Sequence, residues 1–194
     1  MPASRLVVRL NVLALGLISF ALVAAFVDQL VFGELPCPLC LLQRAALAAA
    51  GLGFLLNIRF GVRPLHYGLA IMAALVGAAV AMRQILLHIA PGDPGFGSPL
   101  LGQHYYTWAF ITFIGIIFGV AVLLSLPNST DSAVASRQHG RLVGAVMLVF
   151  AFLIPANLVS TLLECGVSQC QDNPVSYDWI TKISAWVKGV GKGE

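Results

Sequence analysis

Residues 36–58, "PCPLCLLQRAALAAAGLGFLLNI", begin with two cysteines and continue as an apolar run. Within residues 41–58 the only charged side chain is Arg44. A helix needs about 20 apolar residues to cross the roughly 30 Å hydrocarbon core of a membrane. The stretch therefore predicts a membrane-spanning helix that carries two thiols at its start.

The rest of the chain has the same character. Further apolar stretches cover residues 10–27, 65–90, 105–126 and 142–163. Hydrophobic residues make up 59% of the 194 residues and charged residues only 10%, against about 25% charged residues in soluble domains. These features predict an all-α integral membrane protein with five spans in one bundle. The net charge of +3 comes from dispersed basic residues, which excludes a nucleic-acid-binding protein.

The first apolar stretch has some features of a signal peptide. Arg5 and Arg9 precede it, and it ends in small residues at 23–25. Because four further spans follow, we expect an anchor that is not cleaved.

The arginines predict how the spans are oriented. Positive residues that flank spans are retained on the cytoplasmic side. The flanking arginine pairs are Arg5 and Arg9, Arg59 and Arg63, and Arg137 and Arg141. All three pairs fall on one side of a five-span protein, so we expect a cytoplasmic N-terminus and a C-terminus on the outside.

This orientation places all four cysteines on the outer side. Cys37 and Cys40 start the second span, and Cys165 and Cys170 follow the fifth. An oxidising compartment such as a periplasm allows both pairs to form disulfides. Free N–H groups at a helix start favour a negatively charged sulfur and so favour thiol exchange. Two incidental buried cysteines and a zinc site of four sulfurs remain as alternatives.

Two arginines and a histidine fall within or near the ends of spans. Arg44 follows Cys40 by one helical turn, so the two share a helix face. Arg83 and His88 lie near the outer end of the third span, at a similar depth. A charge inside a membrane segment indicates a functional site. The alternative is that these side chains snorkel to the headgroups.

The segment "PCPLCLLQR", residues 36–44, after one span and before an arginine-bearing loop, resembles the DsbB-type disulfide-bond formation proteins. These are bacterial inner-membrane enzymes that reoxidise a periplasmic DsbA-type thiol oxidase and pass electrons to quinone. The resemblance covers residues 5–127 and implies a four-helix catalytic core. It implies that Cys40 is the thiol beside the quinone, Cys37 its disulfide partner and Arg44 the quinone-site arginine. His88 is a weaker match, and Arg83 is a further candidate for the quinone site.

The chain departs from this family in the loop between the third and fourth spans. The family carries its second cysteine pair there, but residues 90–106, "APGDPGFGSPLLGQHYY", contain none. The prolines and glycines predict turns, and the loop is expected to cap the outer end of the bundle. It is either an inert connector or a contributor of Tyr105, Tyr106 or Trp108 to the quinone wall.

The segment "ECGVSQCQDNP", residues 164–174, supplies the replacement pair. We expect Cys165 and Cys170 to form a disulfide that the fifth span delivers to the outer side. Residues 1–127 are then the core, residues 128–163 the cytoplasmic loop and fifth span, and residues 164–194 a periplasmic tail. A purely structural disulfide is the alternative.

The tail also carries apolar residues at helical spacing. They are Val175, Trp179, Ile180, Ile183, Trp186 and Val187. This pattern predicts an interfacial amphipathic helix with its tryptophans in the headgroup belt, and a docking face for another protein is the competing use.

The expected function is therefore a thiol:quinone oxidoreductase of the bacterial inner membrane. Electrons are expected to pass from a periplasmic DsbA-like protein of thioredoxin fold to Cys165 and Cys170, then to Cys37 and Cys40, and then to ubiquinone or menaquinone. No metal is expected in this scheme. A metal-binding membrane protein and a non-catalytic membrane scaffold are the rival functions.

Overall fold

The computed structural model describes residues 3–126, 140–166 and 170–184, except residues 173, 178 and 182. Its helices are α1 (Ala3–Val31), α2 (Pro38–Phe60), α3 (Pro64–Leu87), α4 (Tyr105–Ser125) and α5 (Arg141–Cys165). Each is long and apolar enough to cross a membrane. The prediction of an all-α, multi-pass membrane protein is confirmed.

The helix ends follow the local sequence. Pro38 and Pro64 lie in the first turns of α2 and α3, where a missing N–H costs nothing. Gly61 ends α2 with φ +89°, a conformation that glycine adopts without strain. The predicted third span, residues 65–90, was too long, because α3 ends at Leu87 and His88 caps it.

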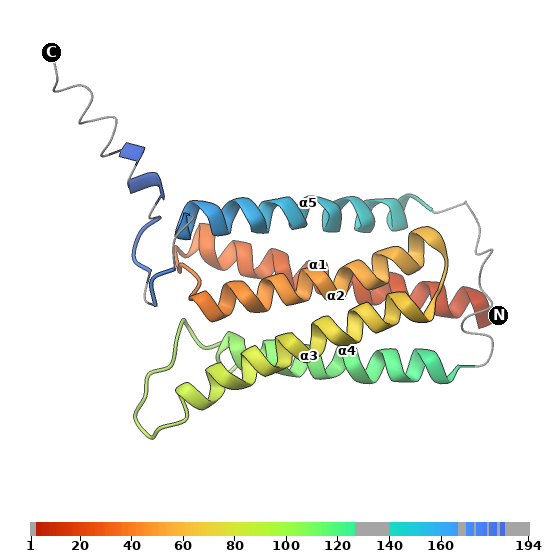
Figure 1. The fold of residues 1–194 in the computed structure, drawn as a ribbon, viewed down its shortest axis with the longest axis horizontal. Coiled ribbons are helices and arrows are strands. Elements are labelled where there is room, and N and C mark those ends of the chain that lie inside the picture. Colours follow the sequence, from red (N-terminus) through yellow and green to blue (C-terminus); the bar gives the residue numbers. More distant parts are fainter. Residues whose placement is uncertain are drawn as a thin grey trace, which may run out of the picture.

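The five helices form one bundle around α2, which contacts each of the other four. Its most extensive contact is with α3, α4 packs mainly on α3, and α5 lies against α1 and α2 (Figure 1). The fifth helix therefore packs beside the helix that carries Cys37 and Cys40 at its start.

Glycines allow the helices to approach closely. A Cβ atom on Gly53 of α2 would collide with the backbone carbonyl of His66 on α3, and one on Gly51 would collide with the ring of Phe150 on α5. Small residues at such crossings are typical of helix packing in membranes. They hold α3 and α5 against α2.

A buried polar network joins α1, α2 and α3 at the end of the bundle that holds the start of α1. Asn11 Nδ2 donates to the Tyr67 hydroxyl (2.8 Å), and Asn57 Nδ2 donates to Asn11 Oδ1 (3.1 Å). Asn57 Oδ1 in turn lies 2.9 Å from Nδ1 of His66. Buried polar groups are stable when hydrogen-bonded in this way, so the network fixes the three helices relative to one another.

Large apolar side chains point away from the bundle. Phe20, Phe118 and Phe152 are 73%, 68% and 71% exposed, from α1, α4 and α5. Such a surface would be unstable in water and is the surface that lipid requires.

Both cysteine pairs lie at one end of the bundle (Figure 1). This cysteine end comprises the end of α1, the start of α2, the end of α3, the start of α4 and the end of α5. The opposite end holds the start of α1 and the turn between α2 and α3. Which end faces the cytoplasm stays a prediction, and Arg137 lies outside the described residues.

Only part of the predicted amphipathic tail helix is described. Residues 179–181 and 183–184 are helical, and the side chains of Trp179 and Ile183 are 40% and 50% exposed. Trp186 and Val187 lie outside the described residues, so a longer interfacial helix stays a prediction.

Candidate redox site at the cysteine end

Cys37 and Cys40, the core pair, are free thiols at the start of α2. Cys37 is the N-cap of the helix, and its Sγ accepts a hydrogen bond from the backbone N–H of Cys40 at 3.1 Å. Cys37 is buried and Cys40 is partly exposed. The N-cap geometry places both sulfurs at the positive end of the helix dipole.

Gln84 of α3 contacts both sulfurs of the core pair. Its Nε2 lies 3.2 Å from Cys37 Sγ and 3.5 Å from Cys40 Sγ. Gln43 Nε2 donates to Gln84 Oε1 at 2.7 Å, which fixes the orientation of the Gln84 amide. Gln84 is almost fully buried, so it gives the sulfurs a polar contact that water does not replace.

The neighbouring sulfur of Cys40, together with burial, raises the pKa of the Cys37 thiol. Two adjacent sulfurs cannot both carry a negative charge at low cost. Ionisation of Cys37 is therefore unfavourable when Cys40 already carries a negative charge.

Arg44 lies one turn after Cys40 and is only 8% exposed. It donates to Gln29 Oε1 at 2.7 Å and to the Ala25 carbonyl at 2.8 Å, and its Cζ lies 5.6 Å from the centroid of the Phe26 ring. All three partners belong to α1 and all are neutral. The guanidinium is thus held inside the bundle, a geometry that does not fit snorkelling to the headgroups. Arg44 follows Cys40 by four residues in α2, so the two side chains share a helix face.

Gln29 connects Arg44 to α5 and the tail. Its Nε2 donates to the hydroxyls of Ser160 (2.9 Å) and Tyr177 (3.1 Å), while its Oε1 accepts from Arg44. Gln29 is 3% exposed. One side chain therefore links α1, α2, α5 and the tail by hydrogen bonds at the cysteine end.

Cys165 and Cys170, the tail pair, form a disulfide. This confirms the predicted pairing. Cys165 ends α5 and is 5% exposed, whereas Cys170 is partly exposed. Gly166, between them, has φ +66° and lets the chain turn back at the end of the helix.

Glu164 is a buried acid beside the tail pair. It is 4% exposed, and among the described residues no group hydrogen-bonds its Oε2. Ser160, one turn before Glu164, is hydrogen-bonded to Gln29, which accepts from Arg44. These bonds place the last turn of α5 near Arg44.

Among the described residues, neither Arg83 nor His88 hydrogen-bonds a sulfur of the core pair. Arg83 lies on an exposed face of α3, and the polar residue that α3 brings to the core pair is its neighbour Gln84. His88 Nδ1 lies 3.0 Å from Asp93 Oδ1, and the His88 ring stacks on Tyr106 at 5.7 Å. A role for Arg83 or His88 in quinone binding stays a prediction.

The loop between α3 and α4 covers the cysteine end. Glu34, which precedes the core pair, accepts hydrogen bonds from the backbone N–H of Ser98 (3.1 Å) and from its hydroxyl. The predicted turns are present, with positive φ at Gly92, Gly95, Gly97, Leu101 and Gly102. The start of α4 adds Tyr106, which is buried and stacks on His88 and His104, whereas Trp108 donates to the Leu100 carbonyl.

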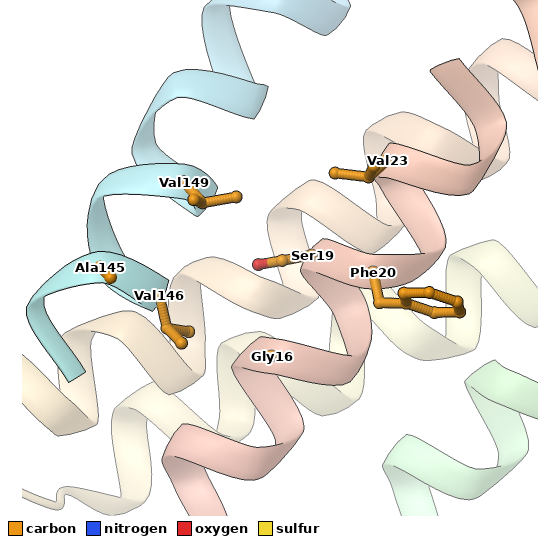
Figure 2. Close-up of a pocket in the computed structure, with 7 residues that line it drawn as sticks. All are labelled: Gly16, Ser19, Phe20, Val23, Ala145, Val146 and Val149. Carbon is orange, nitrogen blue, oxygen red and sulfur yellow. The ribbon is translucent and has the colours of Figure 1, made fainter. Parts of the chain in front are cut away.

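A separate apolar groove of about 290 Å³ lies between α1 and α5 (Figure 2). Its lining residues are Gly16, Ser19, Phe20, Val23, Ala145, Val146 and Val149. The one hydroxyl, that of Ser19, donates to the Leu15 carbonyl of its own helix. The groove lacks the polar groups that redox chemistry needs, so the candidate site is the polar cluster at the cysteine end.

Sequence reasoning missed Gln29, Gln84 and Glu164. Gln84 is a polar residue within an apolar stretch, which is the signal that led to Arg44. Gln29 and Glu164 lie just beyond the ends of the predicted spans, and the helices α1 and α5 extend far enough to include them.

Comparison with known protein families matches the part of the chain that contains the core pair. The family model "Disulfide bond formation protein DsbB" matches residues 8–97. Disulfide bond formation protein B of Chromobacterium violaceum is 37% identical over 105 residues, 50% of this chain and 61% of that protein. Disulfide bond formation protein B 2 of Burkholderia lata is 42% identical over 86 residues, 43% of this chain and 51% of that protein.

The chain spans about half the length of the curated relatives it matches. No solved structure matches it. The helix α5 and the tail pair lie outside the segment that the family model covers. Over residues 8–97, which contain the core pair, Gln29, Arg44 and Gln84, the chain is therefore similar to the DsbB-type proteins.

Proposed function

We propose that this protein is a membrane thiol:quinone oxidoreductase that generates disulfides in a soluble dithiol protein. The observation that carries the proposal is the arrangement of the core pair: two free thiols at a helix start, with a buried arginine one turn away. A low-dielectric site with one fixed positive charge favours a thiolate at Cys40, and the thiolate is the reactive form of cysteine.

The tail pair is the entry point for electrons. A thiolate of the soluble partner attacks the sulfur of Cys170, because Cys165 is the more buried of the two. The bond between Cys165 and Cys170 breaks, and Cys165 leaves as a thiolate. The second thiol of the partner then displaces Cys170, so the partner departs with a disulfide and the tail pair is a dithiol.

The core pair receives these electrons by the same chemistry. With Cys37 and Cys40 as a disulfide, a tail thiolate attacks one sulfur, and the second tail thiol resolves the mixed disulfide. The tail disulfide is restored and the core pair becomes the dithiol, the form present in this structure. Cys165 ends α5, and Ser160 of the same helix is linked through Gln29 to Arg44, one turn after Cys40, which supports transfer between the two pairs.

The polar groups around Cys40 fit a quinone as the electron-accepting substrate. A quinone takes up two electrons and two protons and is soluble in the bilayer. Arg44, one turn after Cys40, and Gln84, which contacts both sulfurs, are buried donors, and the two carbonyl oxygens of a quinone can accept hydrogen bonds from such donors. Cys40 would give up the electron pair as its bond to Cys37 forms again, while Arg44 holds the local charge.

The rival functions fit the site less well. A metal site needs deprotonated cysteine ligands, and the sulfurs of Cys165 and Cys170 are joined to each other. A non-catalytic scaffold does not explain why a buried arginine lies one turn after a pair of free thiols. We assign the protein to the bacterial inner membrane, with the cysteine end in the periplasm and a DsbA-like protein of thioredoxin fold as the partner.

The test is a reconstituted assay. The purified protein in detergent is mixed with a reduced DsbA-like protein, with and without ubiquinone or menaquinone, and the free thiols of the partner are counted over time. The proposal predicts catalytic loss of partner thiols only when quinone is present. The proposal would be contradicted if, with either quinone present, each molecule of the protein oxidised no more than one equivalent of partner dithiol.

A further inference from the structure

The amide group of Gln84 lies against both sulfurs of the core pair. Its Nε2 is 3.2 Å from Cys37 Sγ and 3.5 Å from Cys40 Sγ, and among the described residues these two sulfurs are its acceptors. Because an amide nitrogen carries two hydrogens, each sulfur can receive one of them. Gln84 is 1% exposed, so water does not replace either sulfur as an acceptor.

Gln43 of α2 determines which end of the Gln84 amide faces the sulfurs. Its Nε2 donates to Gln84 Oε1 at 2.7 Å, and Gln43 is itself only 5% exposed. If the Gln84 amide alone turned over, the two Nε2 groups would face each other as donors without an acceptor. The bond therefore keeps Oε1 of Gln84 toward Gln43 and Nε2 toward the sulfurs. We call these two side chains the amide clamp.

The amide clamp interacts differently with the two redox states of the core pair. Reduction of a disulfide between Cys37 and Cys40 takes up two electrons and two protons, breaks the sulfur–sulfur bond and leaves the two thiols present here. Only the reduced pair can lose a proton to form a thiolate, and an ionised acceptor makes hydrogen bonds roughly twice as strong as a neutral one. A cysteine pair whose reduced form is stabilised is a stronger oxidant.

We infer that Gln84 raises the reduction potential of the core pair, and that Gln43 is the positioning residue that orients the Gln84 amide for this purpose. Loss of the clamp makes the core pair harder to reduce. In the relay, which rests on the proposed function, the tail dithiol gives two electrons and two protons to the core pair and becomes a disulfide. The clamp favours transfer in this direction.

The inference is tested on the full-length protein in detergent, freed of quinone and without the soluble partner. The protein is equilibrated with mixtures of reduced and oxidised glutathione, quenched with acid and alkylated, and mass spectrometry gives the reduced fraction of each cysteine pair. Gln84→Met keeps a side chain of similar length without a donor. We expect it to lower the equilibrium constant for reduction of the core pair about three- to tenfold, since one hydrogen bond accounts for such a factor.

Two references show whether the effect is specific to the core pair. The tail pair in the same molecules should keep its wild-type equilibrium constant. Gln103→Met makes the same change at an exposed position in the loop before α4 and should leave both pairs at their wild-type values. A wild-type constant for the core pair in Gln84→Met would overturn the inference, and so would an equal shift in the tail pair.

Gln43→Met tests the orientation of the amide and leaves Gln84 in place. It should shift the core pair in the same direction by a smaller factor. Combined with Gln84→Met it should add nothing, because Gln43 acts through Gln84. If Gln84→Met does not fold, Gln43→Met carries the test, and a wild-type constant in that variant would overturn the inference. Since these measurements need neither quinone nor partner, their failure is distinct from failure of the reconstituted assay.

Discussion

Arg44 is the residue on which the site depends, because it carries the positive charge. Its guanidinium is fixed by two hydrogen bonds to α1 and by contact with the face of Phe26, so it enters the site already oriented. Preorganised charge of this kind stabilises a developing anion without reorganisation. The oxygens that accept from Arg44 are neutral and do not cancel its positive charge, which can then stabilise an anion at Cys40.

Replacement of Arg44 should affect the quinone step and spare the exchange step. A hydrogen bond from a charged donor contributes about 1.5–3 kcal/mol, so Arg44→Ala should raise the apparent KM for quinone by roughly tenfold or more. Arg44→Lys keeps the charge without the planar fork, so its KM for quinone should fall between the values of the wild type and Arg44→Ala. Steady-state kinetics with varied quinone measure the effect.

Arg59→Ala serves as the matched control. Arg59 lies in the last turn of α2, at the opposite end of the bundle, with its guanidinium over Phe60. Its loss should leave the KM at the wild-type value. An unchanged KM in Arg44→Ala would limit Arg44 to a structural role.

At the scale of the helices, α2 is the element that positions the site. Its N-terminus holds the core pair, and its middle packs against α3 and α5 through Gly53 and Gly51. The α3 contact brings Gln84 to the sulfurs, and the α5 contact brings Ser160 to Gln29, which binds Arg44. Packing in the membrane interior therefore sets the geometry at the cysteine end.

Gly53→Ala tests the contact between α2 and α3. The new methyl group would meet the backbone carbonyl of His66, which cannot rotate away as a side chain can. Overpacking of this kind costs about 1–3 kcal/mol, so the thermal unfolding midpoint in detergent should fall by several degrees. Gly115→Ala in α4 is the control, because its methyl group meets nothing within 4 Å and should leave the midpoint equal or slightly higher. Equal midpoints for both variants would contradict the close packing.

The loop between α3 and α4 should respond to acid through Asp93. The backbone N–H of Gly95 and the ring of His88 lower the pKa of the Asp93 carboxyl. A lowered pKa means that the ionised form supports the folded loop: this support is complete above the unfolded value of about 3.9 and is lost as the pH falls through the folded pKa. The amide NMR signal of Gly95 should therefore move toward an open-loop position below about pH 4.

Asp93→Asn keeps the shape of the side chain and removes its charge. Its Gly95 signal should stay constant over the same acid range. A wild-type signal that does not move between pH 5 and pH 2 would contradict the role of the Asp93 carboxylate.

For the whole molecule, the sequence predicted the parts that depend on composition and spacing. Five spans, the tail disulfide and the position of Arg44 after Cys40 all follow from patterns along one segment. Contacts between helices did not follow, because they depend on how each helix is rotated. Each residue turns the helix by about 100°, which is why Gln84 meets the sulfurs while its neighbour Arg83 lies on an exposed face.

The position of α5 also could not be read from the sequence. Its apolar residues show which segment spans the membrane but not which helices it contacts. Contact with α1 and α2 depends on glycines that allow close approach and on the bonds of Gln29 to Ser160 and Tyr177. This packing gives the fifth helix a part in the site as well as in delivery of the tail pair.

The central claim is a serial relay from the tail pair to the core pair, and one comparison tests it directly. The redox states of all four cysteines and of the soluble partner are followed by thiol trapping and mass spectrometry in the Cys165→Ser, Cys170→Ser double variant with excess quinone. The account predicts that quinone still oxidises Cys37 and Cys40, while the partner stays reduced because its entry point is missing. Oxidation of the partner at the wild-type rate by this variant would contradict the relay and make the tail disulfide structural.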